Sequence, residues 1–373
     1  MCKIIALVFN MKNVCLFNFP EMENFHGYRL KSFDPLKYFS RFAHWGLGDL
    51  FRFGVHGWNY RCALLDAGGI DRLYRERNIE YMQMIKDFVD EFKDYDLIVM
   101  STYNFIHPEV WWKYLQKPIK ILGFIDDPYS TLRRDLPCLW AFDGAFYISP
   151  SYIDDLLFKD VFSRWGKPAR WFPLVFSKLE KPQEDNEEFF RRRKIDICYV
   201  GNPHPMKIDR LIKIKKYFKE RVNIYGRWKF NGYAGFLQIF YGQKIYPHRV
   251  LPLTNEERRN LYWNTKIGFN MHVSNSYFET GNARMYEIPA HGMMMICDKG
   301  GANAHTSIFK DGTEAVYYDS IEEAIEIMDY YIEHDGERLQ IAKCGYERFW
   351  RDYEWEKNLK GFLDWAIGLR DNA

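Results

Sequence analysis

Short runs of apolar residues alternate along the chain with longer segments in which apolar side chains recur every three or four positions. The short runs are typical of strands that are buried on both faces, and the longer segments are typical of helices that cover a sheet. The first half therefore predicts a parallel, doubly wound α/β sheet. Its expected strands are residues 4–9, 96–101, 119–125, 144–149 and 169–174, and its expected helices are 71–92, 108–115 and 151–158.

A second alternating series follows a charged segment. Its expected strands are residues 196–200, 222–225, 249–251, 267–271 and 293–297, and its expected helices are 206–219, one that starts at 254, 282–291 and 320–332, with further helices to the end. Two of these helices open with a residue pair typical of a capping box, Thr254 with Glu257 and Ser320 with Glu323.

These patterns predict two Rossmann-like doubly wound domains that face each other across a cleft. We expect a first domain at residues 1–177, a linker at 178–194, a second domain at 195–350, and a C-terminal helix within 351–373 that can pack back on the first domain. The linker ends in the basic run 191–194. We interpret this run as a solvated face, with a phosphate or nucleic-acid patch as the alternative.

Composition agrees with a two-domain globular protein. The chain has 373 residues, of which 47% are hydrophobic, 27% are charged and 18% are aromatic. The aromatic residues indicate large cores, or else platforms for sugar rings and bases. A net charge of +2 gives no global attraction to DNA or to anionic lipid. The seven cysteines lack a CxxC pair, which favours reduced thiols in a cytoplasmic protein, and no apolar run is long enough for a membrane span.

Polar residues follow several of the predicted strands, where ligands of parallel sheets bind. Three strands of the second half are followed by such residues. Two of the strands are followed by a glycine, which permits close approach of a ligand, and by cations that suit a phosphate: Gly201 with Lys207 and Arg210, and Gly226 with Arg227. The third is followed by the polar residues Asn270 and His272. Neither a Walker loop nor a GxGxxG motif is present. A single histidine is more often structural than catalytic, although its position at a strand end favours a role in the site.

The segment FETGNARMYEIPAHG carries two glutamates eight residues apart, Glu279 and Glu287. If Asn282 caps the helix that follows, the free N–H groups beside Arg284 suit a diphosphate. Glu287, one turn further on, can then accept hydrogen bonds from a ribose diol. An ordinary capped surface helix is the alternative, and Pro289 is expected to kink it.

In the first half, Asp126 and Asp127 follow a predicted strand and precede Pro128. One of them can face the cleft as a general base or orient a sugar hydroxyl, and capping of the turn is the alternative. We expect no metal site, because no third ligand has matching spacing.

From about residue 195 to residue 348 the chain resembles the C-terminal domain of group 1 glycosyltransferases of GT-B fold, and most of all the spore-maturation-protein-like branch. The segments that carry the resemblance occur in this order: DICYVGNPHPMKIDRL, VNIYGR, LTNEERRNLYWNTKIGFNMH, GNARMYEIPAHGMMMICD and FKDGTEAVYYDS.

The resemblance implies a nucleoside-diphosphate sugar, UDP- or GDP-linked, as donor, with no metal and no other cofactor. Glu287 would bind the ribose, Glu279 would lie near the donor sugar, and Lys207 would neutralise the diphosphate. Asn202 stands where the family usually has Arg, so that Arg210 or Arg227 would substitute. The E-x7-E spacing fits retaining members of the family. An inverting enzyme would instead use Asp126, Asp127 or His272 as the base.

The sequence thus predicts a cytoplasmic hexosyl- or pentosyltransferase without an integral membrane segment. A nucleotide-sugar epimerase or hydrolase of the same fold is one alternative, and an inactive nucleotide-sugar-binding module is another. The acceptor stays open between a glycan, a lipid, a protein and a modified nucleic acid, as does the oligomeric state.

Overall fold

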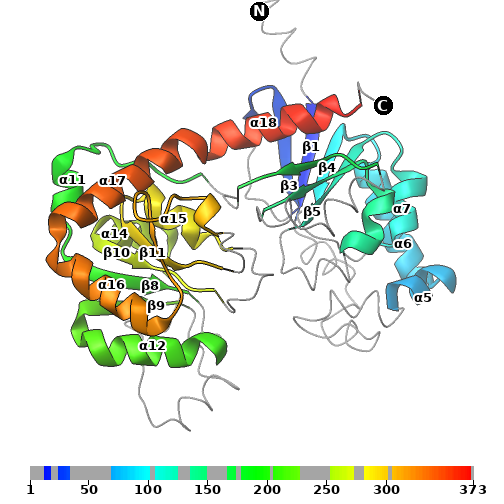
Figure 1. Cartoon of the computed structure of the whole chain (residues 1–373). Helices are drawn as coiled ribbons and strands as arrows, with labels where there is room; N and C mark the ends of the chain where they lie inside the picture. Colours follow the sequence, from blue (N-terminus) through cyan, green and yellow to red (C-terminus); the bar gives the residue numbers. More distant parts are fainter. Residues whose placement is uncertain are drawn as a thin grey trace, which may run out of the picture. The chain divides into compact units, whose positions relative to one another are not determined.

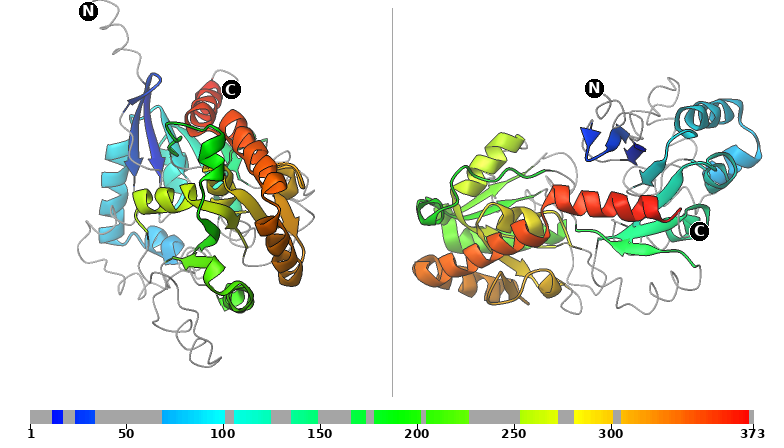
Figure 2. Two further views of the ribbon diagram at one scale, coloured as in Figure 1. Left: turned by 90° about the vertical axis from the view of Figure 1, so that its left-hand side faces the viewer. Right: turned by 90° about the horizontal axis from the view of Figure 1, so that it is seen from above.

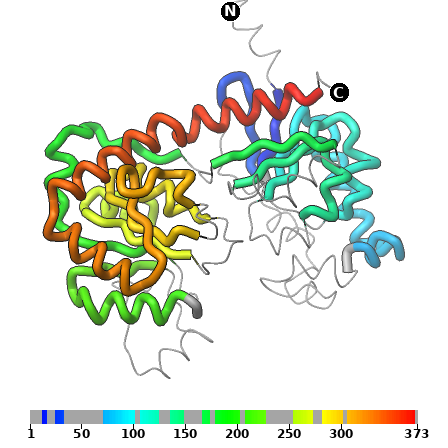
Figure 3. Tube along the Cα trace, viewed as in Figure 1, coloured from blue at the N-terminus to red at the C-terminus, as the bar shows by residue number. Residues whose placement is uncertain are grey.

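The computed structural model describes residues 12–17, 24–33, 69–100, 106–124, 135–148, 166–173, 178–201, 205–226, 253–272, 281–300 and 305–370, and Figure 3 traces them in colour. The chain divides into two compact units. The first consists of Met1–Ser177 and Glu356–Ala373, and the second of Lys178–Trp355. Each unit contains a largely parallel sheet flanked by helices, as the sequence predicts (Figure 1).

The sheet of the first unit has the strand order β2-β3-β1-β4-β5-β6-β7 in the described part of the chain, and every neighbouring pair except β2 with β3 is parallel. Its strands are β1 (Lys12–Phe17), β2 (Asn24–Phe25), β3 (Tyr28–Phe33), β4 (Leu97–Met100), β5 (Ile119–Phe124), β6 (Gly144–Tyr147) and β7 (Ala169–Trp171). The last four confirm predicted strands. The first three were not expected, while the strand expected at 4–9 and the helix expected at 151–158 lie outside the described residues.

The single helix expected over residues 71–92 is wrong, because two helices share this segment. They are α5 (Gly69–Arg75) and α6 (Ile79–Phe92), and the chain turns between them at Arg77, whose φ is 52°. The side chain of Asn78 accepts a hydrogen bond from the backbone N–H of Tyr81 at 3.0 Å. Asparagine competes in this way for backbone N–H groups, and it therefore starts a new helix here. The unit also contains α7 (Pro108–Tyr114) and the 3₁₀ helix η3 (Leu136–Ala141).

The C-terminal helix α18 (Trp355–Gly368) packs on this first sheet (Figures 1 and 2). The ring of Phe362 meets the rings of Phe146 and Phe172 edge to face, at centroid distances of 5.4 and 5.2 Å. The hydroxyl of Tyr28 donates to Asp364 at 2.6 Å. The two ends of the chain therefore complete one core.

The sheet of the second unit is parallel throughout its described strands, in the order β12-β11-β10-β8-β9. The strands are β8 (Ile195–Val200), β9 (Val222–Tyr225), β10 (Thr265–Phe269), β11 (Met294–Asp298) and β12 (Val316–Tyr318). The first four confirm the predicted series within two residues, β12 was not expected, and the strand expected at 249–251 lies outside the described residues. Ile197 and Tyr199 pack into the main core of this unit, while Cys198 between them is buried beside Met293. Both faces of β8 are thus covered.

Capping sets the start of two helices in this unit. Thr254 and Glu257 form the predicted capping box, in which the Thr254 hydroxyl accepts from the Glu257 N–H at 3.1 Å and the Glu257 carboxylate accepts from the Thr254 N–H at 2.8 Å. The box expected at Ser320 is only half formed, because Glu323 accepts from the N–H of Asp319 instead. The helices are α11 (Glu187–Arg191), α12 (Pro205–Phe218), α14 (Asn255–Trp263), α15 (Arg284–Ala290), α16 (Ile321–Glu333) and α17 (Asp335–Asp352), with the 3₁₀ turn η4 (Lys219–Arg221).

Arg193 contradicts the interpretation of the basic run 191–194 as a solvated face. Its side chain is buried and donates to the carbonyl groups of Tyr262, Thr265 and His291 at 2.9, 2.7 and 2.7 Å. Tyr262 and His291 lie at the C-terminal ends of α14 and α15, where backbone carbonyls lack the regular i+4 partner of the helix. A cation is favourable at such ends, and the run therefore contains one structural arginine.

None of the helices in the described part of the chain combines the length and the apolar content that crossing a membrane requires.

Candidate functional site

Three predicted site residues follow neighbouring strands of the second unit. Gly201 comes directly after β8, Gly226 after β9 and Asn270 after β10. Since these strands are parallel and adjacent, their carboxyl ends share one edge of the sheet. Four further predicted site residues lie outside the described residues, namely Asp126, Asp127, Arg227 and Glu279.

Asn270 joins the end of β10 to the start of α15. Its side-chain oxygen accepts from Asn282 Nδ2 at 3.1 Å and from Arg284 Nε at 2.9 Å. Its amide nitrogen donates to the Cys297 sulfur at 3.3 Å, and its carbonyl group accepts from the Tyr318 hydroxyl at 3.0 Å. The residue is fully buried and its polar atoms are engaged within the protein. Asn270 therefore orients Arg284, whereas the sequence predicted a direct contact with the donor.

Asn282 does not occupy the helix cap expected of it. The helix begins at Arg284, and Ala283 stands in the cap position without a side-chain hydrogen bond. The Asn282 side chain instead accepts from the Arg284 N–H at 3.0 Å, two residues further on. This contact forms an Asx turn. Asn282 therefore fixes the entry to the helix from the residue before the cap, and not from the cap itself. Pro289 lies inside the helix, as predicted. It belongs to the last turn, two residues before the cap residue His291.

Three cations reach this edge of the sheet from two helices. Lys207 and Arg210 belong to α12, and Arg284 opens α15. The Arg284 guanidinium lies over the Tyr199 ring, 5.5 Å from its centroid. A Cβ atom added to Gly201 would lie 2.6 Å from the Tyr199 hydroxyl and 3.0 Å from Arg284 Nη1. Gly201 and Arg284 are therefore immediate neighbours, and the absence of a side chain at 201 leaves room for the guanidinium.

His272 is held by an aspartate that the sequence analysis missed. Its ring Nδ1 lies 2.6 Å from Asp298 Oδ1, and its backbone N–H donates to Asp298 Oδ2 at 3.2 Å. Because a carboxylate only accepts hydrogen bonds, the proton lies on Nδ1. Burial lowers the pKa of His272. The charges of Arg284 and Lys207 lower it further, whereas Asp298 opposes the shift. Burial opposes ionisation of Asp298, but His272 outweighs it and lowers the pKa of this carboxyl.

The expected role of His272 as a base needs direct contact with an acceptor hydroxyl. In this structure its side chain is 1% exposed, and its ring packs against the ring of His305 with the centroids 4.1 Å apart. The carbonyl group of His272 accepts a long hydrogen bond from Arg210 Nη1 at 3.4 Å. The contacts of His272 therefore link α12 to the strand end.

A group of four buried side chains could hold a metal ion by its composition. Single ligand atoms of His272, Cys297, Asp298 and His305 lie within 4.8 Å of one another. The 2.6 Å contact between His272 and Asp298 is a hydrogen-bond distance, however, and the Cys297 thiol donates to Asp298 at 3.4 Å. Burial raises the pKa of this thiol. The contacts are therefore those of a hydrogen-bonded network that protons hold together.

Glu287, the expected ribose ligand, faces α14. Its Oε1 atom lies 3.5 Å from Arg258 Nη1, and its Oε2 atom accepts from the Tyr262 hydroxyl at 3.5 Å. The side chain is 14% exposed. Its carbonyl group contacts Nδ1 of His291, at the end of the helix, at 2.7 Å. Glu287 is thus fixed at both its backbone and its carboxylate, with part of the carboxylate open to a ligand.

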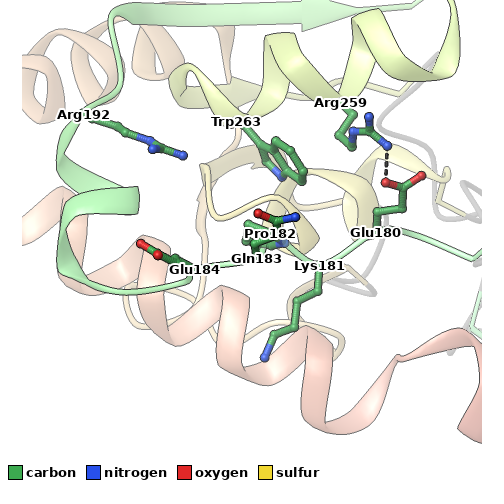
Figure 4. A pocket seen from close by; sticks show the side chains of 8 residues that line it. All are labelled: Glu180, Lys181, Pro182, Gln183, Glu184, Arg192, Arg259 and Trp263. Atoms are coloured by element: carbon green, nitrogen blue, oxygen red, sulfur yellow. Dashed lines mark hydrogen bonds and ion pairs between the residues drawn. The ribbon is translucent and has the colours of Figure 1, made fainter.

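A separate hollow of about 400 Å³ lies between the linker and α14 (Figure 4). Trp263 stands over it, and Arg259 at its rim pairs with Glu180. No residue of the predicted site lines this hollow. Its lining residues are Glu180, Lys181, Pro182, Gln183, Glu184, Arg192, Arg259 and Trp263.

Comparison with known proteins agrees with this architecture. Residues 207–364 match the family model described as glycosyl transferase-like. No curated protein sequence matches the chain. Among solved structures, the chain is similar to an α-glucosyltransferase in complex with UDP-glucose and DNA containing an abasic site, with a TM-score of 0.58 and 10% identity over 95% of this chain and 99% of that chain.

Two further structures show the same likeness. Anabaena Alr3699/HepE in complex with UDP and glucose has a TM-score of 0.58 and 9% identity over 95% of this chain and 98% of that chain. Staphylococcus aureus TarM has a TM-score of 0.53 and 12% identity over 76% of this chain and 57% of that chain. At these identities the likeness concerns the fold, which is GT-B. The chain thus has the GT-B fold, and its residues 207–364 are similar to the glycosyl transferase-like family.

Proposed function

We propose that the protein transfers a hexose from a UDP-sugar, with UDP-glucose as the first candidate, and that the second unit holds this donor. The observation that carries the proposal is the placement of Lys207, Arg210 and Arg284 around the carboxyl ends of β8 and β10, with Glu287 one turn along α15. Cations suit a diphosphate, and a carboxylate suits the two hydroxyls of a ribose. The neighbouring glycine, Gly201, lets a ligand approach the backbone closely.

The proposed chemistry follows from where charge develops. As the bond between sugar and diphosphate breaks, negative charge grows on the leaving diphosphate. Fixed cations stabilise that charge without having to reorient during the reaction. Arg284 is fixed in this way by its bond to Asn270 and by the Tyr199 ring. The three side-chain cations would supply the charge, so that we expect transfer to proceed without an added divalent metal.

The choice of UDP-glucose rests on the solved structures of the same fold. The α-glucosyltransferase was solved with UDP-glucose, and Anabaena HepE with UDP and glucose or with UDP-glucose. Retention of configuration is the outcome that the spacing of Glu279 and Glu287 favours. Asp126 and Asp127 stay the candidate bases for an inverting reaction. The acceptor is to be sought among glycans, lipids, proteins and modified nucleic acids.

Binding of nucleotides by the purified protein tests the proposal. We expect UDP and UDP-glucose, but not GDP or ADP, to raise the melting temperature, since a ligand at 100 times its dissociation constant stabilises by about 2.7 kcal/mol. Lys207→Met and Glu287→Gln should each weaken UDP binding about tenfold or more. Lys213→Met is the control, because Lys213 lies on the same helix and pairs with Glu322 on the surface. Equal UDP binding by all variants, or no shift with any nucleoside diphosphate at millimolar concentration, would refute the proposed site.

Turnover is the second measurement. UDP release should depend on UDP-glucose, persist in EDTA and increase with the correct member of an acceptor panel. Formation of a free epimer without acceptor would identify an epimerase instead. Tight UDP-glucose binding without any transfer or hydrolysis would identify an inactive binding module.

A further inference from the structure

Helix α14 presents two polar side chains to the carboxylate of Glu287. Arg258 and Tyr262 are four residues apart and therefore lie one turn apart on the same side of the helix. Arg258 Nη1 lies 3.5 Å from Oε1 of Glu287, and the Tyr262 hydroxyl lies 3.5 Å from Oε2. Each oxygen of the carboxylate thus has its own neighbour on α14.

Arg258 is itself held in place. Its Nη2 atom donates to the side-chain oxygen of Asn255 at 3.2 Å, in the first turn of the same helix. The start of this helix is fixed in turn by the capping box of Thr254 and Glu257. The Arg258 side chain is 33% exposed, so that it reaches Glu287 from the solvent side and is not part of the core. A fixed guanidinium is thus aimed at one oxygen of the carboxylate.

A ribose diol makes two demands on this carboxylate. The carboxylate must be ionised to accept from both hydroxyls, and its plane must be held in one orientation. An incoming diphosphate beside Arg284, one turn before Glu287, brings negative charge that repels the carboxylate. A cation at Arg258 offsets that effect. The contacts to Arg258 and Tyr262 are long, and they leave lone pairs on both oxygens for the two hydroxyls.

We propose that Arg258, assisted by Tyr262, is a positioning residue that orients Glu287 for the donor ribose and thereby sets the preference for a ribonucleotide over a deoxyribonucleotide donor. This inference rests on the proposed function, because it assumes that Glu287 binds the ribose of a nucleotide-sugar. In this proposal Arg258 acts through its contact with Glu287.

The next residue along the helix offers a matched control. Arg259 has the same chemistry, but it points to Glu180 of the linker, and its guanidinium lies over the Trp263 ring at 5.3 Å. Arg259→Met removes a cation at nearly the same place without touching Glu287. Loss of net charge alone would therefore weaken nucleotide binding equally in Arg258→Met and Arg259→Met.

The experiment measures the dissociation constants of UDP and 2′-deoxy-UDP by titration calorimetry and compares their ratio between variants. In the parent protein we expect UDP to bind about tenfold more tightly or better, since a hydrogen bond to a charged group is lost with the hydroxyl. Arg258→Met should reduce this ratio about threefold to tenfold. Tyr262→Phe should reduce it less, Arg258→Lys should restore it in part, and Arg259→Met should leave it unchanged.

A double variant separates positioning from direct contact. In the Glu287→Gln background, Arg258→Met should change the ratio no further, because its route to the ribose is already lost. The inference is overturned if Arg258→Met leaves the ratio unchanged, whether or not both ligands bind more weakly. It is also overturned if Arg258→Met still lowers the ratio in the Glu287→Gln background. Failure of the proposed function would give a different result, namely the absence of UDP binding by the parent protein.

Discussion

Replacement of Arg193 by methionine should lower the melting temperature of the second unit more than substitution of any neighbouring residue. Methionine is apolar and of similar length, but it lacks the guanidinium, which lies over the ring of Phe189 at 4.7 Å. It removes the donors that serve the carbonyl groups of Tyr262, Thr265 and His291. Two of these carbonyls end the helices α14 and α15, so that the loss affects helix ends and strand together.

The size of the effect follows from two opposing contributions. A buried acceptor left without a donor costs about 1–3 kcal/mol. Three carbonyl groups lose a donor here, although that of Tyr262 keeps the backbone N–H of Asn264. Against this, the buried guanidinium is itself costly, since burial lowers the pKa of Arg193 to about 9 and the nearby Arg338 adds to the shift. The charge has no acidic partner among its hydrogen-bond contacts, and methionine removes its desolvation cost. We expect a net loss of about 3–5 kcal/mol, because the lost carbonyl hydrogen bonds outweigh the desolvation cost that is removed.

Urea unfolding, followed by the signal of tryptophans such as Trp263, measures this loss. For a unit of this size, about 3–5 kcal/mol corresponds to a melting temperature lower by roughly 10 °C. Arg191→Met is the control, because Arg191 is 60% exposed and pairs with Glu187 on the surface, and it should change stability by less than about 0.5 kcal/mol. A loss below about 1 kcal/mol for Arg193→Met, or equal losses for both variants, would show that the three carbonyl bonds contribute little net stability.

Three further changes test other parts of the second unit. Gly201→Ala should weaken UDP binding about tenfold in calorimetry, because the added Cβ would lie 2.6 Å from the Tyr199 hydroxyl and 3.0 Å from Arg284 Nη1 and displace both; unchanged affinity would contradict this. Burial lowers the pKa of His291 to about 4 from an unfolded value near 6.5, so that the unfolded chain gains a proton first and stability falls as the pH falls through this window. Urea unfolding should give about 2 kcal/mol less stability at pH 5 than at pH 7 from this residue, and His291→Gln should remove that part of the slope. Asp298→Asn should lower the free energy of unfolding by about 1–3 kcal/mol, because it weakens the hydrogen bonds to His272. If protons hold this network together, elemental analysis of the parent protein should find less than one metal ion per chain.

The strands of the second unit were predictable because each is a short apolar run that is buried on both faces. Segments such as 195–200 and 294–298 carry this pattern without needing a partner to explain it. The capping box of Thr254 was predictable for a similar reason, since both of its hydrogen bonds join residues three apart. Local patterns therefore located the elements and the strand ends at which the candidate site lies.

Other features depend on partners that are distant in the sequence. Strand β3 has the alternating segment YRLKSF, and only its pairing with β1 and β2 makes it part of a sheet. Asp298 ends a strand and looks like the last residue of an apolar run, whereas its function as a partner of His272 needs the pairing of β10 with β11. Asn78 had a local signal, but the apolar spacing on both sides of it continued without a change of phase and concealed the break.

The same long-range contacts connect stability with the candidate site. The arginine that lies deepest in the linker, Arg193, bonds to the carboxyl-terminal ends of α14 and α15. These two helices carry Arg258 and Glu287, whose side chains meet between them. A change that loosens the helix ends should therefore also loosen the orientation of the carboxylate, although Arg193 is not among the contacts of Glu287. Arg193→Met should thus lower the preference for UDP over 2′-deoxy-UDP even at temperatures at which the unit stays folded, and an unchanged preference in a destabilised variant would show that α14 fixes the carboxylate independently of its C-terminal anchor.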